Sequence, residues 1–129
     1  MILLFKHFKY SIIWIFLIVL LSLIPSPNFN NSSFLIFPHF DKIIHVSLYF
    51  ILTVTLLAGL NKYKHQYSRI LIYTISLVIT IILGGFLELV QGYMEPITGR
   101  GFDVFDFFSN IAGSLLAIFL FIIYQFSVR

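Results

Sequence analysis

The sequence predicts an all-α membrane protein, a compact bundle of four transmembrane helices. Hydrophobic residues make up 60% of the 129 residues and charged residues only 10%, whereas soluble domains average about 25% charged residues. Four apolar stretches reach or approach the length of about 20 residues that a helix needs to cross a bilayer. Only short polar connections separate these stretches, so we expect a single domain that covers residues 1–129.

The first predicted span covers residues 8–24 and follows a basic start with Lys6 and Lys9. A basic start before a short apolar core resembles a signal peptide, but no pair of small residues follows the core where a peptidase would cut. The core is also short for a span. Apolar residues before it can lengthen the helix if Lys6 and Lys9 extend along it toward the interface. We therefore expect a retained first helix.

Three further spans are predicted at residues 41–60, 70–91 and 103–126. The connections are a polar loop from Pro25 to about Phe40, a basic loop over residues 61–69, and a loop from Gly92 to Phe102. The third span contains no proline and is rich in Ile and Leu, which favours an uninterrupted helix in the membrane.

The distribution of charge predicts the orientation of the bundle. With four spans, both termini lie on the same side as the loop after the second span. That side carries only basic residues: Lys6, Lys9, Lys62, Lys64, Arg69 and Arg129. The other side carries two basic residues and all five acids: Lys42, Arg100, Asp41, Glu88, Glu95, Asp103 and Asp106. The positive-inside rule therefore places both termini in the cytoplasm and the acidic end outside. We expect a multi-pass protein of a cell membrane, the bacterial cytoplasmic membrane, with the lipid bilayer rather than a nucleic acid as its partner.

Polar residues recur at helical spacing near the outer ends of three spans. They are Asp41, His45 and Tyr49 on the second span, Glu88 and Gln91 on the third, and Asp103, Asp106 and Asn110 on the fourth. Polar side chains within a membrane normally face the interior of the bundle, so these three faces should converge on one outward site. On the fourth span the same face continues into Gly113 and Ala117, whose small side chains let helices approach closely.

These residues also form two ordered blocks. The first block, Asp41-Lys42-Ile43-Ile44-His45 followed by Tyr49, resembles the DKxxHxxxY pattern of VanZ-like membrane proteins. The second, Gly84-x3-Glu88-x2-Gln91 and then Arg100-x2-Asp103-x2-Asp106-x3-Asn110-x2-Gly113, resembles the later block of the same family, and the match covers about residues 38–120. One departure is that the family often has another glycine soon after Gly113, where this chain has Leu116 and Ala117.

The resemblance implies a cell-envelope protein whose outward polar site binds or modifies an envelope component. The namesake of the family accompanies a vancomycin-resistance operon and confers low-level resistance to the glycopeptide teicoplanin. An antibiotic-resistance function is therefore expected by resemblance, with a lipid-linked envelope precursor or a glycopeptide as partner. The resemblance does not supply a reaction.

Each candidate residue can be assigned a role. We assign His45, Glu88 and Asp106 to an acid–base cluster, and we assign substrate binding to Asp41, Lys42, Tyr49, Gln91, Arg100, Asp103 and Asn110. Structural roles remain open for several of them. Asp41 and Asp103 stand where helix caps are preferred, and Asp106 lies in a first turn that favours acids. Tyr49 and Gln91 could join helices, and Arg100 could pair with Glu95.

Three of the candidates are harder to explain structurally. His45 and Asn110 lie too deep in their spans to act as caps. Glu88 lies near the end of the third span, where the helix dipole disfavours an acid. Glu88 could raise the basicity of His45 for general acid–base catalysis, and Lys42 or Arg100 could hold a phosphate or carboxylate.

The residues leave two classes of function open, a binding module and a small membrane enzyme that acts on a lipid-linked head group. The chain has no cysteine, which excludes thiolate chemistry. His45 with Glu88, Asp41 or Asp106 could bind a divalent cation, but the spacing is not diagnostic, so we expect no metal and no cofactor. Transport is disfavoured because the inner halves of the spans are apolar.

The predicted orientation can be tested with single cysteines. Ser32→Cys and Thr98→Cys should react with a membrane-impermeant thiol reagent in intact cells, whereas Lys64→Cys should react only after lysis, because the reagent cannot cross the bilayer to the basic side. The parent chain without cysteine is the control. Labelling of Lys64→Cys in intact cells would contradict the orientation.

Overall fold

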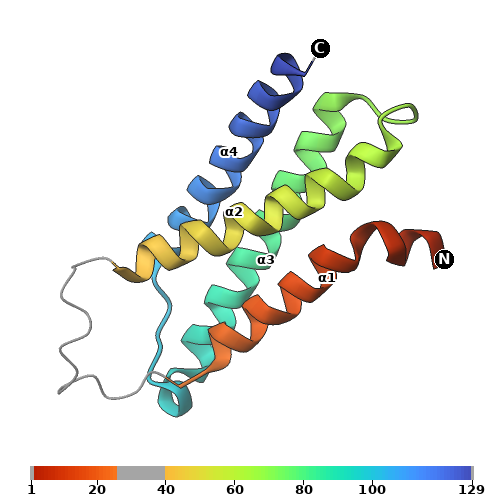
Figure 1. The fold of residues 1–129 in the computed structure, drawn as a ribbon. Coiled ribbons are helices and arrows are strands. Elements are labelled where there is room, and N and C mark those ends of the chain that lie inside the picture. The colour runs from red at the N-terminus through yellow and green to blue at the C-terminus, as the bar shows by residue number, and fades with distance from the viewer. Residues whose placement is uncertain (1, 26–39, 129) are drawn as a thin grey trace.

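The computed structural model describes residues 2–25 and 40–128, with only the backbone described for residues 2–5. Within these ranges the chain forms the helices α1 (Ile2–Leu23), α2 (Phe40–Leu60), α3 (Arg69–Thr98) and α4 (Val104–Ser127), with a short 3₁₀ turn, η2 (Asn61–Tyr63), after α2 (Figure 1). All four α-helices are long and apolar enough to cross a membrane. The predicted four-helix, all-α membrane architecture is therefore confirmed. Most of the predicted loop from Pro25 to Phe40 lies outside the described residues.

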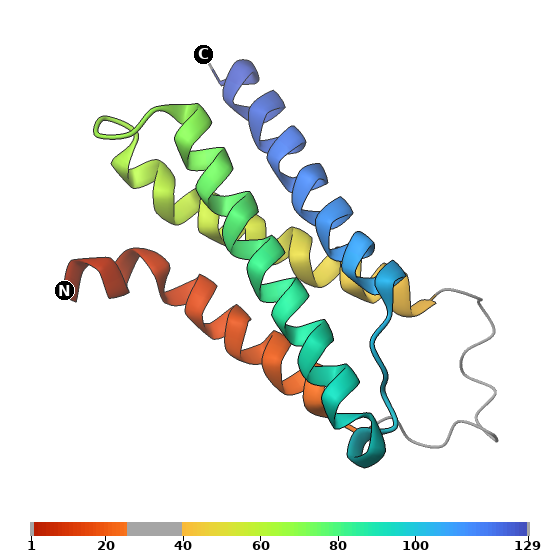
Figure 2. The same cartoon turned by 180° about the vertical axis from the view of Figure 1, so that it is seen from behind.

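The helices pack around α2, which contacts α1, α3 and α4. The termini and the turn after α2 lie toward one end of the bundle, and the connection between α3 and α4 lies at the other (Figures 1 and 2). Because α2 and α4 both begin at this second end, they run in the same direction. The side of the membrane that each end faces stays a prediction.

The contact between α2 and α4 depends on the absence of a side chain at Gly113. A Cβ atom at Gly113 would lie 2.2 Å from the carbonyl oxygen of Val46, closer than any real contact. Ala117, one turn further along α4, is only 1% exposed. These observations confirm the predicted packing face of the fourth helix. They also fix the register in which polar residues of α2 meet those of α4.

The predicted loop from Gly92 to Phe102 is wrong over most of its length, because α3 continues to Thr98. Pro96 lies in the last turn, where its missing N–H removes one bond near the helix end. The helix stops at Gly99, whose φ of 68° is in the left-handed region that glycine adopts without strain. The correction places Glu88 well inside the helix rather than near its end. The dipole argument for Glu88 therefore does not apply, since the dipole acts only within the terminal turns.

The longer α3 also changes the orientation test. Thr98 is 4% exposed, so a cysteine there is shielded from the reagent. Glu95 is exposed one turn earlier on the same helix, and Glu95→Cys is the better reporter for this end. Lys64, the reporter for the opposite end, is exposed. Ser32 lies outside the described residues.

Replacing Gly113 should separate α2 from α4. Gly113→Ala should lower the free energy of unfolding by about 1–3 kcal/mol, the usual cost of forcing extra volume into a packed interior. Unfolding in mixed detergent micelles, followed by circular dichroism, measures this change.

The matched control is Gly85→Ala, the same substitution on α3. There the new Cβ would lie 3.3 Å from the ring of Phe107, a side chain that can shift. The variant should be neutral or slightly stabilising because alanine favours helix over glycine. Equal effects of the two substitutions would contradict the close contact at Gly113.

Candidate functional site

The first turns of α2 and α4 are joined by Lys42. Its ammonium group forms ion pairs and hydrogen bonds with the carboxylates of Asp103 and Asp106. Asp103 is also the N-cap of α4, where Oδ1 accepts a hydrogen bond of 2.7 Å from the backbone N–H of Phe105. The hydrogen bond from Lys42 lowers the pKa of the Asp103 carboxyl from its usual value. Asp103 therefore combines the capping role with an ion pair to Lys42.

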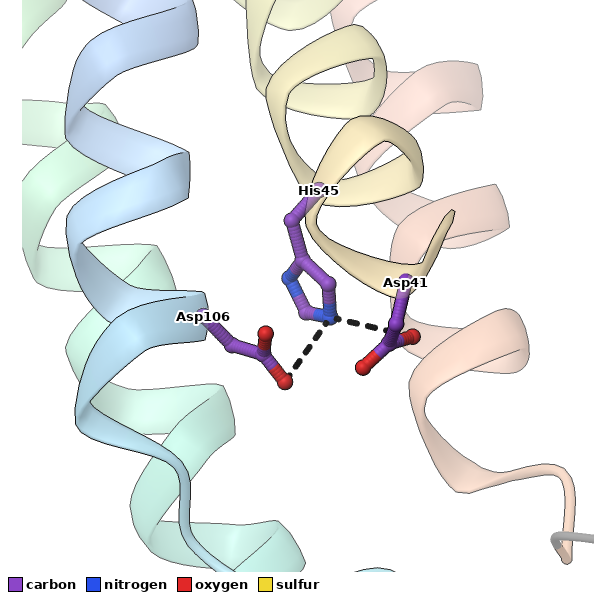
Figure 3. A group of neighbouring side chains, drawn as sticks. All are labelled: Asp41, His45 and Asp106. Atoms are coloured by element: carbon purple, nitrogen blue, oxygen red, sulfur yellow. Dashed lines mark ion pairs between the residues drawn. The ribbon is translucent and has the colours of Figure 1, made fainter. Parts of the chain in front are cut away.

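His45 lies one turn deeper on α2 and is 8% exposed. Its Nδ1 is 2.9 Å from Oδ1 of Asn110 on α4, and it donates to that oxygen. Nε2 faces two carboxylates, at 3.5 Å from Oδ2 of Asp106 and 4.0 Å from Oδ1 of Asp41 (Figure 3). The hydrogen bond to Asn110 fixes the orientation of the ring and aims Nε2 between the carboxylates.

Glu88 brings α3 into the same cluster. The residue is only 1% exposed, and its Oε1 lies 3.8 Å from Nδ1 of His45. Its Oε2 accepts a hydrogen bond of 3.3 Å from the backbone N–H of Asp103, just before α4 begins. Glu88 therefore has a structural task as well as a position beside His45. The predicted grouping of His45, Glu88 and Asp106 occurs in the structure.

Arg100 and Gln91 turn toward α1. Nη1 of Arg100 donates to the carbonyl of Leu21 at 3.1 Å, and Nε2 of Gln91 donates to the carbonyl of Ser22 at the same distance. Both carbonyls belong to the last turn of α1, whose backbone acceptors have no partner within the helix. Nη2 of Arg100 also lies 3.7 Å from Oδ1 of Asp41, so Arg100 pairs with Asp41 rather than with Glu95.

These carbonyls of α1 were not among the predicted site groups. The available signal was general: every helix end leaves carbonyls that need donors, and a cation near a helix C-terminus is favourable. Nothing in the sequence indicates that the donors would come from α3 and from the residue after Gly99.

Tyr49 lies below the cluster, one turn deeper than His45. The residue is 2% exposed and belongs to the apolar core with Ile18, Leu52, Leu56 and Leu87. A Cβ at Gly84 would lie 3.3 Å from its ring and 3.2 Å from Nδ2 of Asn110. Tyr49 and Gly84 therefore pack against the inner side of the polar cluster.

A groove of about 580 Å³ lies beside the cluster between α2 and α4. Lys42 and Asp103 line its polar part, and the remaining lining residues are Val46, Phe105, Phe108, Ser109 and Ala112. Phe105 and Phe108 are largely exposed, so this side of the groove opens toward the lipid. A groove could not be predicted from the sequence, because helical periodicity shows that a face is apolar but not that it is hollow.

The charges of the cluster do not balance. Asp41, Glu88, Asp103 and Asp106 supply four carboxylates, against the two cations Lys42 and Arg100. Both cations are already paired with carboxylates, which weakens the expectation that either one clamps a phosphate or carboxylate. A site with excess carboxylates favours cations, and it also favours hydroxyl or amine donors.

Comparison with models of known protein families, with curated proteins and with solved structures finds no match to this chain. The structure itself establishes a multi-pass membrane protein with a buried polar cluster at one end. The resemblance to VanZ-like proteins stays a prediction.

The hydrogen bond between Glu88 and Asp103 predicts different outcomes for two substitutions. Glu88→Gln keeps an oxygen acceptor and should leave the free energy of unfolding unchanged or slightly raised, because an uncharged group is easier to hold in the membrane. Glu88→Leu removes the acceptor and should cost about 1–3 kcal/mol, since the backbone N–H of Asp103 loses its partner. Unfolding in mixed micelles measures both variants. Equal destabilisation would show that the charge of Glu88, not its acceptor, supports the fold.

Proposed function

We propose that the protein binds an amphipathic component of the cell envelope, with the polar head of the component at the cluster and its hydrocarbon in the groove. The observation that carries this proposal is the groove between α2 and α4. Its lining changes from the charged pair of Lys42 and Asp103 to the apolar residues Val46, Phe105 and Phe108. An occupant that matches this lining has a polar end and an apolar end, which is the chemistry of a membrane lipid or a lipid-linked precursor.

The depth of the site supports the same occupant. The cluster begins in the first turns of α2 and α4, and His45 lies only about 6 Å along the helix from Asp41. Lipid head groups lie at this level of a bilayer, whose polar regions flank a hydrocarbon core about 30 Å thick. A lipid could therefore enter from the membrane, without crossing water, with its head level with Lys42.

We place the protein in the bacterial cytoplasmic membrane, with the cluster on the outer side, on the basis of the asymmetry of basic residues. Together with the resemblance to VanZ-like proteins, this location supports a role in the cell envelope and in resistance to glycopeptides such as teicoplanin. A lipid-linked envelope precursor would fit both the groove and a role in the cell envelope, since such molecules carry a polar head on a long apolar chain.

A second candidate is an enzyme that modifies the bound head group by acid–base chemistry. The observation in its favour is the buried imidazole of His45, which Asn110 orients and which three carboxylates surround. A positioned imidazole beside a carboxylate is a common source of general acid–base catalysis. In this candidate, Asp106 is the carboxylate that faces Nε2, and Glu88 is the one that faces Nδ1.

The proposal predicts that a large side chain in the groove displaces the occupant. Ala112→Trp should reduce the amount of lipid that remains bound after detergent purification by about tenfold, a loss of roughly 1.4 kcal/mol of binding free energy. Native mass spectrometry measures the bound lipid, and teicoplanin susceptibility of an expressing bacterium gives a second readout. Since Ala112 is outside the polar cluster, its replacement tests the groove alone.

The matched control is Leu115→Trp, which adds a similar ring on α4 at a residue that does not line the groove and is 49% exposed. It should retain the lipid of the parent. If the parent retains no lipid, or if Ala112→Trp retains as much as Leu115→Trp, the groove is not the binding site and the proposal is wrong.

A further inference from the structure

The side chains around Nε2 of His45 fit a metal ion. Nε2 of His45, an oxygen of Asp41 and an oxygen of Asp106 all lie within 4.8 Å of one another (Figure 3). Bonds from zinc to nitrogen or oxygen are about 2.0–2.2 Å long, which puts two ligand atoms on one ion roughly 3–3.6 Å apart. The 3.5 Å between His45 and Asp106 is in this range. The 4.0 Å between His45 and Asp41 requires a small shift of a side chain that is 48% exposed.

The orientation of His45 supports the same conclusion independently. Nδ1 donates to Oδ1 of Asn110, which leaves Nε2 as the nitrogen that faces the two carboxylates. Metal-binding histidines usually donate their second ring N–H to an oxygen in this way, and the bond fixes the tautomer that leaves the other nitrogen free to bind. Among the described residues, Nε2 forms no hydrogen bond, and it is not fully enclosed by the protein, so a ligand can reach it.

A proton on Nε2 is a weaker explanation of this geometry. A charged N–H bonded to a carboxylate normally brings nitrogen and oxygen to about 2.7–2.9 Å. The observed distances of 3.5 and 4.0 Å leave more space than such a hydrogen bond needs. The space is wide enough for an ion bound to both partners.

The charge of the cluster gives a third argument. Four carboxylates and two cations leave two negative charges when His45 is neutral. The N-termini of α2 and α4 offset part of this excess, with roughly half a positive charge each. Glu88 lies well inside α3, and its contact with a helix end is the hydrogen bond that it accepts from the backbone N–H of Asp103 at the start of α4. If all four carboxylates are ionised, a negative charge remains in a site where isolated charge is expensive, and either a bound dication or protons on the buried carboxylates would neutralise it.

We propose that Asp41, His45 and Asp106 bind a first-row divalent metal ion such as Zn²⁺ or Mn²⁺. An imidazole with two carboxylates suits these metals, whereas Ca²⁺ takes six to eight oxygen ligands. Lys42 and Asn110 support the ligands, since Lys42 holds the other oxygen of Asp106 and Asn110 orients His45. The metal site does not depend on what the groove binds. This proposal differs from the expectation of no metal that was drawn from the sequence.

The test uses the whole chain in detergent, without a polyhistidine tag and after treatment with a chelator. Titration with Zn²⁺ or Mn²⁺ should show about one saturable site per chain and should raise the melting temperature as expected when a ligand binds only the folded state. His45→Gln and Asp41→Asn should each weaken binding by about 10- to 100-fold or more, the loss typical of disturbing a metal site. Elemental analysis and calorimetry measure the stoichiometry and affinity.

Two controls separate the site from adventitious binding. His65→Gln removes an exposed histidine of the loop after η2, and Glu95→Gln removes an exposed acid at the end of α3. Both should bind metal like the parent. Asp41 is half-exposed in the first turn of α2, so Asp41→Asn should fold even if His45→Gln does not.

Three results would overturn the proposal. In the first, the parent shows no saturable metal binding, which would indicate that protons rather than a metal ion neutralise the carboxylates. In the second, His45→Gln and Asp41→Asn bind as tightly as the two controls. In the third, Ca²⁺ binds more tightly than Zn²⁺ and Mn²⁺, which would indicate a site of carboxylates without His45. None of these results bears on lipid in the groove, so failure here is distinguishable from failure of the proposed function.

Discussion

The close contact between Gly113 and the Val46 carbonyl is the constraint on which the site depends. Since α2 and α4 run in the same direction, this contact sets a common register toward their N-termini. Lys42 then meets Asp103 and Asp106, and His45 meets Asn110. In another register, these polar side chains would face lipid or apolar residues of the neighbouring helix. The packing of small residues deep in the bundle therefore positions the polar groups nearer its end.

The same parallel arrangement explains why the acids are tolerated. Asp41 and Asp106 lie in the first turns of α2 and α4, and Asp103 caps α4. Two helix N-termini thus meet at one place, and each favours negative charge by up to about 1 kcal/mol at ordinary sites. Glu88 is different because it comes from the middle of α3. Its compensation comes from the backbone N–H of Asp103 and from the neighbouring His45.

The sequence was sufficient for the fold class and for the central grouping of the site. Polar residues at spacings of three and four define a face on each helix, and the requirement that such faces point inward brings His45, Glu88, Asp106 and Asn110 together. The sequence did not predict the hydrogen-bond partners of Arg100 and Gln91. Periodicity assigns a residue to a face of its own helix, but it does not show which neighbour covers that face. Both residues donate to carbonyls of α1.

The end of α3 shows a second limit. A loop was predicted from Gly92 onward, yet α3 continues past both Gly92 and Pro96. Gly92 is needed for packing, because a Cβ there would lie 2.9 Å from Cβ of Phe102. Pro96 is tolerated because the helix ends two residues later in any case. The contact between Gly92 and Phe102 joins residues whose proximity helical periodicity does not predict.

Some polar residues form contacts that join the helices, and others have atoms that remain free to bind a ligand. Arg100 and Gln91 secure the end of α1, Asp103 caps α4, and Lys42 joins α2 to α4. Nε2 of His45 and the Oδ2 atom of Asp106 take no part in these contacts, although both residues are largely buried. Under the proposed function, these two atoms are the groups left free for a ligand. They lie next to the one polar part of the α2–α4 groove, where a ligand held by its head group would meet them.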